Sequence, residues 1–354
     1  MVHKRYFLLL TAIVFSVGFD AFTLSASTND LIQKTPDGIQ FVRTPEEAFL
    51  NIPDYPFEPN YVFINGLRIH YLDEGDKNAP LILLLHGEPS WSFLYRHMIP
   101  IFVNAGYRVI APDLIGFGKS DKPISRDNYS YNGLVDIMDK FIRSIHVEEI
   151  TLFAHDWGGF IGLRVVAQNP DRFARIIVAN TTLPICNTHP DINWEKNPDA
   201  TLFPKANFQE WLKYSQTVPD LPVGEVIQTS TYIKQPDVVI DAYDAPFPSE
   251  LYKTGARMLP VLTCTNNEEN AAAWQVLKKW KKPFLTIWGG MDSIVPTNQA
   301  SNFIENIPGA QGMPHIIIVE ADHFLQEDAG EFIARIAIDF IVSNNKILGT
   351  TNEK

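Results

Sequence analysis

The sequence holds few of the residues on which several large classes of protein depend. It has two cysteines, Cys186 and Cys264, which lie far apart with no cluster of histidine or cysteine around them. This excludes a scaffold of several disulfides and argues against a cysteine-rich metal site. One disulfide is compatible with the pair, but we expect two free, buried thiols, because unpaired cysteine is among the most buried residue types.

Positive charge is also scarce. Lysine and arginine number 29 against 41 aspartates and glutamates, for a net charge of −12, which argues against nucleic acid or an anionic membrane as the main partner. The glycine-containing stretch at 116–120 lacks the spacing of a P-loop, so nucleotide binding is not indicated. The chain has no internal repeat, and its 354 residues, 45% hydrophobic, can bury a large core.

The N-terminal apolar run is short for a membrane span. Residues 6–19 are apolar, follow the basic residues of segment 1–5 and precede a stretch rich in Ser, Thr and Ala. This is the order of a secretory signal peptide, so we expect residues 1–26 to be removed near Ala26 and the protein to be periplasmic or secreted, without stable membrane association. An uncleaved membrane tether and a cytoplasmic protein with a wrongly assigned start are the alternatives.

From residue 61 onward, short apolar runs alternate with amphipathic stretches. An Asn-Gly turn between residues 62–66 and 67–71 predicts a hairpin. Further strands are predicted at 81–85, 108–111, 150–154, 176–179, 284–288 and 315–319. Strands that alternate with helices predict an α/β fold with a mostly parallel central sheet flanked by helices.

The alternation stops between about residues 184 and 257. This stretch is rich in Pro, Asp, Trp and Tyr, and its helix-like segments are 208–215 and 251–259. An insertion with its own helices predicts a cap over the strand ends, where α/β folds bind ligands. The predicted organisation is a signal peptide (1–26), an N-terminal extension (27–60), an α/β-hydrolase core (61–183 and 258–345) and a helical cap (184–257).

A candidate nucleophile stands between a predicted strand and a predicted helix. The sequence Ala154-His-Asp-Trp-Gly-Gly159 has the layout of a nucleophile elbow, in which small residues allow a tight turn to expose the central side chain. Here that side chain is Asp156, whose carboxylate needs no base to be nucleophilic at neutral pH and can attack a saturated carbon. The alternative is that Asp156 only caps the helix at 160–168.

Two later residues complete a candidate triad. Asp292 and His323 each follow a predicted strand, and the order nucleophile, acid, histidine is that of the α/β-hydrolase triad. His323 would deprotonate a water that attacks the ester, and Asp292 would orient its imidazole. The backbone N–H groups of Glu88 and Trp157 are predicted to form an oxyanion hole, with no role for the Glu88 carboxylate. No metal or organic cofactor is indicated.

These motifs resemble those of the haloalkane dehalogenases. The resemblance is carried by His86-Gly-Glu-Pro-Ser-Trp-Ser-Phe-Leu-Tyr-Arg96, Ala111-Pro-Asp-Leu-Ile-Gly-Phe-Gly-Lys-Ser-Asp-Lys-Pro123 and His155-Asp-Trp-Gly-Gly159, and it extends from about residue 41 to the last helix. It implies that Asp156 displaces halide from a haloalkane and that water, activated by His323, hydrolyses the ester to a primary alcohol. The implied partners are a small halogenated hydrocarbon, water and the halide product.

The resemblance also implies a halide site made of two indole N–H groups. Trp157 matches the one beside the nucleophile, and Trp211 matches the one in the cap, with Trp194 as the competing choice. The sequence departs from the family at Asp322, where a glycine usually precedes the catalytic histidine. We expect a monomer, and detoxification would be one use for an exported dehalogenase.

Two other functions stay open from the sequence. An epoxide hydrolase would use the same nucleophile with cap tyrosines as the acid, and Tyr214, Tyr232, Tyr243 and Tyr252 are available. A binding module on an inactive hydrolase fold is the alternative of another class. Such a module would be indicated by loss of a triad residue, and none is lost here.

Overall fold

An eight-stranded sheet forms the centre of the chain. The computed structural model describes residues 31–187, 195–200 and 206–350, so the predicted signal peptide lies outside the described residues. The strand order is β11-β10-β9-β8-β5-β6-β4-β3. The strands are β3 (Asn60–Ile64), β4 (Leu67–Glu74), β5 (Leu81–Leu85), β6 (Arg108–Pro112), β8 (Ile150–His155), β9 (Phe173–Ala179), β10 (Phe284–Gly289) and β11 (Ile316–Ile318).

The pairing of these strands confirms the predicted α/β-hydrolase architecture. β3 and β4 form the antiparallel hairpin, β4 also pairs antiparallel with β6, and the other neighbours are parallel. At the hairpin turn Asn65 and Gly66 have φ angles of 51° and 78°, as a primed two-residue turn requires. Every residue of β5, β8 and β10 is buried, which explains why these strands are continuous apolar runs.

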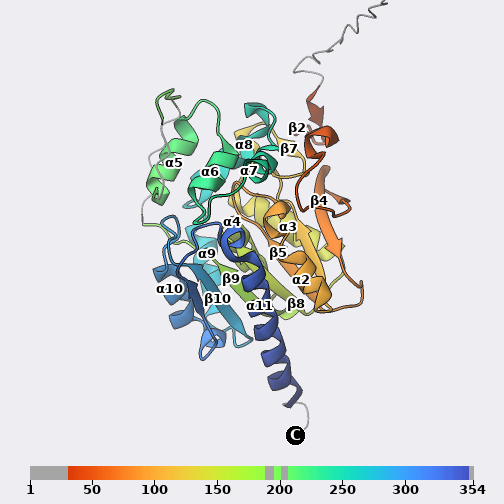
Figure 1. Cartoon of the computed structure of the whole chain (residues 1–354), viewed down its shortest axis with the longest axis vertical. Coiled ribbons are helices and arrows are strands. Elements are labelled where there is room, and N and C mark those ends of the chain that lie inside the picture. Colours follow the sequence, from red (N-terminus) through yellow and green to blue (C-terminus); the bar gives the residue numbers. More distant parts are fainter. Residues whose placement is uncertain (1–30, 188–194, 201–205, 351–354) are drawn as a thin grey trace, which may run out of the picture.

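Helices flank the sheet (Figure 1). They are α2 (Ile99–Asn104), α3 (Tyr131–Ser144), α4 (Trp157–Gln168), α9 (Asn267–Leu277), α10 (Asn298–Asn306) and α11 (Leu325–Thr350), with short 3₁₀ turns η1 (Glu46–Phe49), η2 (Ser92–Tyr95), η3 (Arg126–Asn128), η4 (Pro170–Arg172) and η6 (Pro308–Ala310). A small antiparallel sheet joins the N-terminal segment to the core through β1 (Gln33–Lys34), β2 (Gln40–Val42) and β7 (Lys122–Pro123). No helix in the described part of the chain is long and apolar enough to cross a membrane.

Between β9 and β10 the chain forms a separate group of helices. These are α5 (Phe208–Thr217), α6 (Val223–Thr229), α7 (Asp237–Asp244), η5 (Glu250–Tyr252) and α8 (Thr254–Leu262), and they gather at one end of the molecule (Figure 1). A capping box of Asn207 and Glu210 starts α5. The helix predicted at 251–259 is instead η5 followed by α8, because buried apolar residues continue to Leu262. The division into core and cap stays a prediction, and its boundary at 257 falls inside α8.

The cysteine prediction was wrong. Cys186 and Cys264 form a disulfide, with their Cα atoms 5.4 Å apart and 78 residues between them in sequence. Spacing along the chain could not reveal this pairing, because the fold brings the start of the insertion back beside its end.

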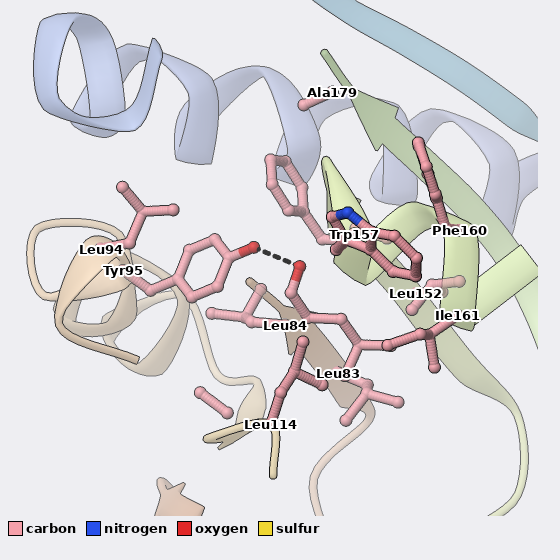
Figure 2. Close-up of a cluster of buried hydrophobic side chains, with 14 of the residues drawn as sticks. Leu83, Leu84, Leu94, Tyr95, Leu114, Leu152, Trp157, Phe160, Ile161 and Ala179 are labelled. Carbon is pink, nitrogen blue, oxygen red and sulfur yellow. Dashed lines mark hydrogen bonds between the residues drawn. The ribbon is translucent and has the colours of Figure 1, made fainter. Parts of the chain in front are cut away.

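A hydrophobic cluster supports the strand ends where the candidate nucleophile lies (Figure 2). Leu83 and Leu84 of β5 and Trp157 and Phe160 of α4 are buried in it. The Tyr95 hydroxyl donates to the carbonyl oxygen at the end of β5, 2.7 Å away. A close-packed base of this kind holds the following loops in one position.

Candidate active site

Asp156 lies on a sharp turn between β8 and α4. Its φ and ψ are 47° and −122°, a left-handed conformation that costs energy for any residue with a side chain. A Cβ on Gly158 would collide with the carbonyl groups of Leu85 and His86, so only glycine fits there. Asp156 occupies the N-cap position of α4, but its side chain makes no capping hydrogen bond. The turn therefore has the geometry of a nucleophile elbow, and the capping interpretation has no hydrogen bond to support it.

The Asp156 carboxylate faces backbone donors on one side. Its Oδ1 accepts the N–H of Glu88 at 2.8 Å. A Cβ on Gly87 would overlap the Asp156 side chain, so glycine permits this close approach. Burial raises the pKa of Asp156 above its ordinary value, while His323 and the N–H groups of Trp157 and Glu88 act in the opposite direction. One carboxylate oxygen thus lies where the predicted oxyanion hole would be.

His323 joins the other two predicted residues. Its Nδ1 lies 2.9 Å from Oδ2 of Asp292, and its Nε2 lies 3.7 Å from Oδ2 of Asp156. The second oxygen of Asp292 accepts the N–H groups of Ile294 and Val295, both at 2.8 Å, which fixes the carboxylate in place. The structure therefore brings the three predicted triad residues together, from three separate strand ends.

The charges around His323 favour its protonated form. Burial alone would lower its pKa, but Asp292, Asp156 and Asp322 raise it to about 9. Asp322 is itself buried, accepts the backbone N–H of His323 at 2.8 Å, and has a pKa raised to about 6 by that burial. Carboxylates therefore face both ring nitrogens of His323, and a third accepts its backbone N–H.

A cavity of about 680 Å³ opens over this triad. Asp156 and His323 line it together with Trp157 and, from α5, Trp211. Both tryptophans are almost completely buried. The other lining side chains are of mixed polarity, and the apolar ones include Pro89, Phe160, Leu183, Phe208, Val226, Pro260, Ile294, Val295 and Phe324. Trp194, the competing choice for the second indole, lies outside the described residues.

The side chain of Glu88, to which the sequence interpretation gave no role, points into the cavity. It is 5% exposed and lines the cavity. Burial and the neighbouring Asp156 raise the pKa of Glu88 well above its usual range, while a hydrogen bond with the Trp211 side chain lowers it. The Glu88 carboxyl group beside Trp211 is a polar part of the cavity wall that the sequence interpretation missed.

Two further polar residues hold the loop of the candidate base. His155 Nε2 lies 2.8 Å from the carbonyl oxygen of His323, and burial lowers the pKa of His155 well below its ordinary value, so a neutral ring donates this bond. Asn180 donates to the carbonyls of Asp322 and His323 at 2.8 and 2.9 Å and accepts the N–H of Gly289. Asn180 directly follows β9, so its place after a strand was the available signal. Among the described residues no cluster of His, Cys, Asp and Glu could hold a metal ion.

The fold and the elbow define the class of protein, an α/β-hydrolase, and the family model described as alpha/beta hydrolase fold matches residues 80–330. Comparison with relatives narrows this class. The chain is 45% identical over 317 residues to a haloalkane dehalogenase of Psychrobacter cryohalolentis, covering 86% of this chain and 99% of the relative. It is 42% identical over 303 residues to one of Mycolicibacterium paratuberculosis, covering 83% and 95%. The chain belongs to the haloalkane dehalogenase family.

Solved structures agree with this assignment. The haloalkane dehalogenase DpaA from Paraglaciecola agarilytica is 34% identical, with a TM-score of 0.72 over 83% of this chain and 96% of its own. Its structure is described as tetrameric. A putative ancestral haloalkane dehalogenase is 25% identical, with a TM-score of 0.67 over 81% of this chain and 99% of its own.

Proposed function

We propose that this protein hydrolyses haloalkanes to a primary alcohol and halide through an alkyl ester on Asp156. Membership of the dehalogenase family supports the reaction. The observation that carries the mechanism is that the two oxygens of the Asp156 carboxylate have different neighbours. Oδ1 accepts the N–H of Glu88, and Oδ2 faces His323. The two oxygens therefore have different roles in the proposed reaction.

The first step is displacement of halide at a saturated carbon. Oδ2 of Asp156 attacks the carbon that carries the halogen, the new C–O bond forms as the carbon–halogen bond breaks, and the bonding electrons leave with the halide. The indole N–H groups of Trp157 and Trp211 are the proposed donors to the leaving halide, because an indole offers one donor on an otherwise apolar side chain. The Trp211 N–H exchanges Glu88 for the halide in this proposal. Both indoles are buried, and a hydrogen bond to a charged group is stronger in such a low-dielectric position than in water.

The second step is hydrolysis of the ester. His323 Nε2 takes a proton from water as the water oxygen attacks the carboxyl carbon of Asp156. Negative charge then develops on Oδ1, where the N–H of Glu88 already donates at 2.8 Å and that of Trp157 is nearby. Asp292 stabilises the imidazolium, which returns its proton to the leaving alkoxide, and the alcohol departs.

Epoxide hydrolysis is less well supported as a second candidate. That reaction needs an acid on the epoxide oxygen, and the sequence offered four cap tyrosines for it. None of the four, Tyr214, Tyr232, Tyr243 and Tyr252, is among the described residues that line the cavity. The Tyr243 hydroxyl is already engaged by Glu327. This geometry favours a halide as the leaving group.

Export stays a proposal, and the disulfide supports it. Disulfides persist in oxidising compartments such as the periplasm and the outside of the cell, and are rare in the cytosol. The monomeric state also stays a prediction, and the tetrameric structure of one solved relative makes a larger assembly the alternative. Light scattering on the purified mature protein measures the oligomeric state directly.

The test of the proposed function is bromide release from 1-bromobutane and 1,2-dibromoethane by the purified protein. We expect turnover by the wild type, loss of steady-state turnover in Asp156→Asn and Asp156→Ala, and unchanged turnover in Asp171→Asn. Asp171 is exposed and offers the same chemical change away from the cavity. Two variants are needed because an amide beside the activated water can be hydrolysed back to aspartate.

A set of epoxides is assayed in parallel. Turnover of epoxides without bromide release would transfer the function to epoxide hydrolysis on the same nucleophile. A folded wild type inactive on both substrate classes would contradict the proposal and favour a binding role. A single turnover in ¹⁸O-labelled water tests the ester directly, because the attacking oxygen stays in the Asp156 carboxylate.

A further inference from the structure

The disulfide joins the two ends of the inserted helices. Cys186 follows β9 on the way out of the sheet, and Cys264 follows α8 on the way back. α5 to α8 therefore lie inside a covalent loop that is closed at its base. Any disulfide stabilises the folded protein by restricting the unfolded chain, but the position of this one also connects it to the cavity.

The outgoing side of this loop is fixed to the core by α9. Asn267 makes two hydrogen bonds with the backbone of Cys186, at 2.6 and 2.8 Å. Asn270 and Trp274 donate to carbonyls in the same segment, residues 183–186, at 2.8 and 2.9 Å. Segment 183–186 is thus held on the core side before the disulfide is considered.

The other end of the disulfide belongs to helices that carry the halide site. Cys264 lies just beyond α8, and Arg257 of α8 makes two hydrogen bonds with α5. Its backbone carbonyl accepts from the Gln216 side chain at 2.7 Å, and its guanidinium donates to the carbonyl of Ser215 at 2.5 Å. α5 also carries Trp211. The disulfide consequently ties the α5–α8 unit to a segment anchored on the core.

This tie lies in the wall of the cavity. Cys186 and Cys264 both line it, together with Leu183, Pro184 and Ile185. Ile185 is 53% exposed although it lines the cavity, so the cavity reaches solvent beside segment 183–186. It also reaches solvent beside α9, since Gln275 and Lys278 line it and are exposed. A change in the distance between segment 183–186 and the end of α8 would change the width of the opening beside that segment.

We propose that the Cys186–Cys264 disulfide sets the size of haloalkane that the enzyme accepts, by fixing the width of the cavity mouth. The inference rests on the proposed function and assigns a specificity-determining role to a pair outside the triad. A dithiol reductant removes the tie: the S–S bond breaks, two thiols form, and the reductant supplies two electrons and two protons as it closes to a cyclic disulfide. The α5–α8 unit and segment 183–186 then lose their covalent connection, and the hydrogen bonds of Asn267 with Cys186 remain.

The experiment compares oxidised wild type, wild type reduced with dithiothreitol, and the double variant Cys186→Ser with Cys264→Ser. kcat and KM are measured for 1-bromobutane and for (bromomethyl)cyclohexane. Without the disulfide, we expect the ratio of kcat/KM for the bulky substrate to that for the linear one to rise about tenfold, equivalent to ~1.4 kcal/mol in relative barrier height. Dithiothreitol should change nothing in the double variant. Reduction of the wild type keeps the test available where the double variant fails to fold.

Three results would overturn the inference. The first is a ratio unchanged within twofold, even where the melting temperature falls, since that describes a purely structural disulfide. The second is the finding of two titratable thiols in protein purified without reductant. The third is absence of bromide release from every haloalkane by the oxidised wild type, which would overturn the proposed function as well. If all three proteins release bromide from 1-bromobutane and the ratio is unchanged, the inference fails while the proposed function stands.

Discussion

Replacing Asp156 with Asn should lower the pKa of His323 by about three units. Oδ2 of Asp156 lies 3.7 Å from Nε2 of His323, and both side chains are buried. At an effective dielectric constant of about 20, two unit charges at that separation interact by ~4.5 kcal/mol, and ~1.4 kcal/mol corresponds to one pKa unit. The pKa of His323, raised to about 9 in the intact protein, should therefore fall to ~6 in the variant.

This shift bears on catalysis because the alkyl ester on Asp156 is neutral, like the amide of asparagine. We expect His323 to be an imidazolium at pH 8 in the free enzyme, since pH 8 lies below its raised pKa of about 9. Formation of the ester removes the nearest charge on the Nε2 side, while Asp292 and Asp322 keep theirs. We expect the pKa of His323 then to fall below 8, so that the imidazolium loses its proton to solvent and alkylation itself creates the base that the second step needs.

NMR titration of the imidazole resonances in free wild type and Asp156→Asn measures the shift. His323→Gln assigns the signal, and Asp171→Asn gives the same charge change at an exposed site. A pKa of His323 that stays within one unit of the wild-type value would refute the argument. It would mean that solvent or local rearrangement screens the Asp156 charge far more than burial of both groups implies.

Four further outcomes are expected. His323→Gln should release about one bromide per protein and retain the alkyl group as added mass on the intact chain, because only ester hydrolysis needs the base. Trp211→Phe should weaken bromide binding about tenfold, as loss of one hydrogen bond worth ~1.4 kcal/mol predicts, measured by quenching of tryptophan fluorescence; unchanged affinity would remove it from the halide site. Asp322→Asn should move the acidic limb of the kcat profile about one unit lower in pH, because one carboxylate that raises the pKa of His323 is lost; a limb that stays in place would count against this. Arg96→Met should cost about 3–5 kcal/mol in the free energy of unfolding by urea, since it leaves the buried Glu327 carboxylate without its positively charged partner; a loss below 1 kcal/mol would contradict it.

The pattern of residues was sufficient for the sheet. Continuous apolar runs such as 81–85 and 150–154 are buried on both faces. Because a strand buried on both faces rarely contains polar side chains, such runs predict the strands. The elbow was equally readable, because close contacts at Gly87 and Gly158 admit no side chain. Chain order then indicated Asp292 and His323, since the carboxyl ends of parallel strands share one edge of the sheet.

What lies between the elements was decided by tertiary structure. The disulfide forms because the fold brings together two cysteines that are 78 residues apart, and no local sequence pattern indicates this. The inward turn of Glu88 depends on its neighbours Asp156 and Trp211, contributed by distant segments. Asn180 likewise acquires its role only when three strand ends meet. Short-range preferences act within a few residues and determine strands, helices and turns, whereas contacts across the sheet edge determine charge, cavity shape and the partners of each side chain.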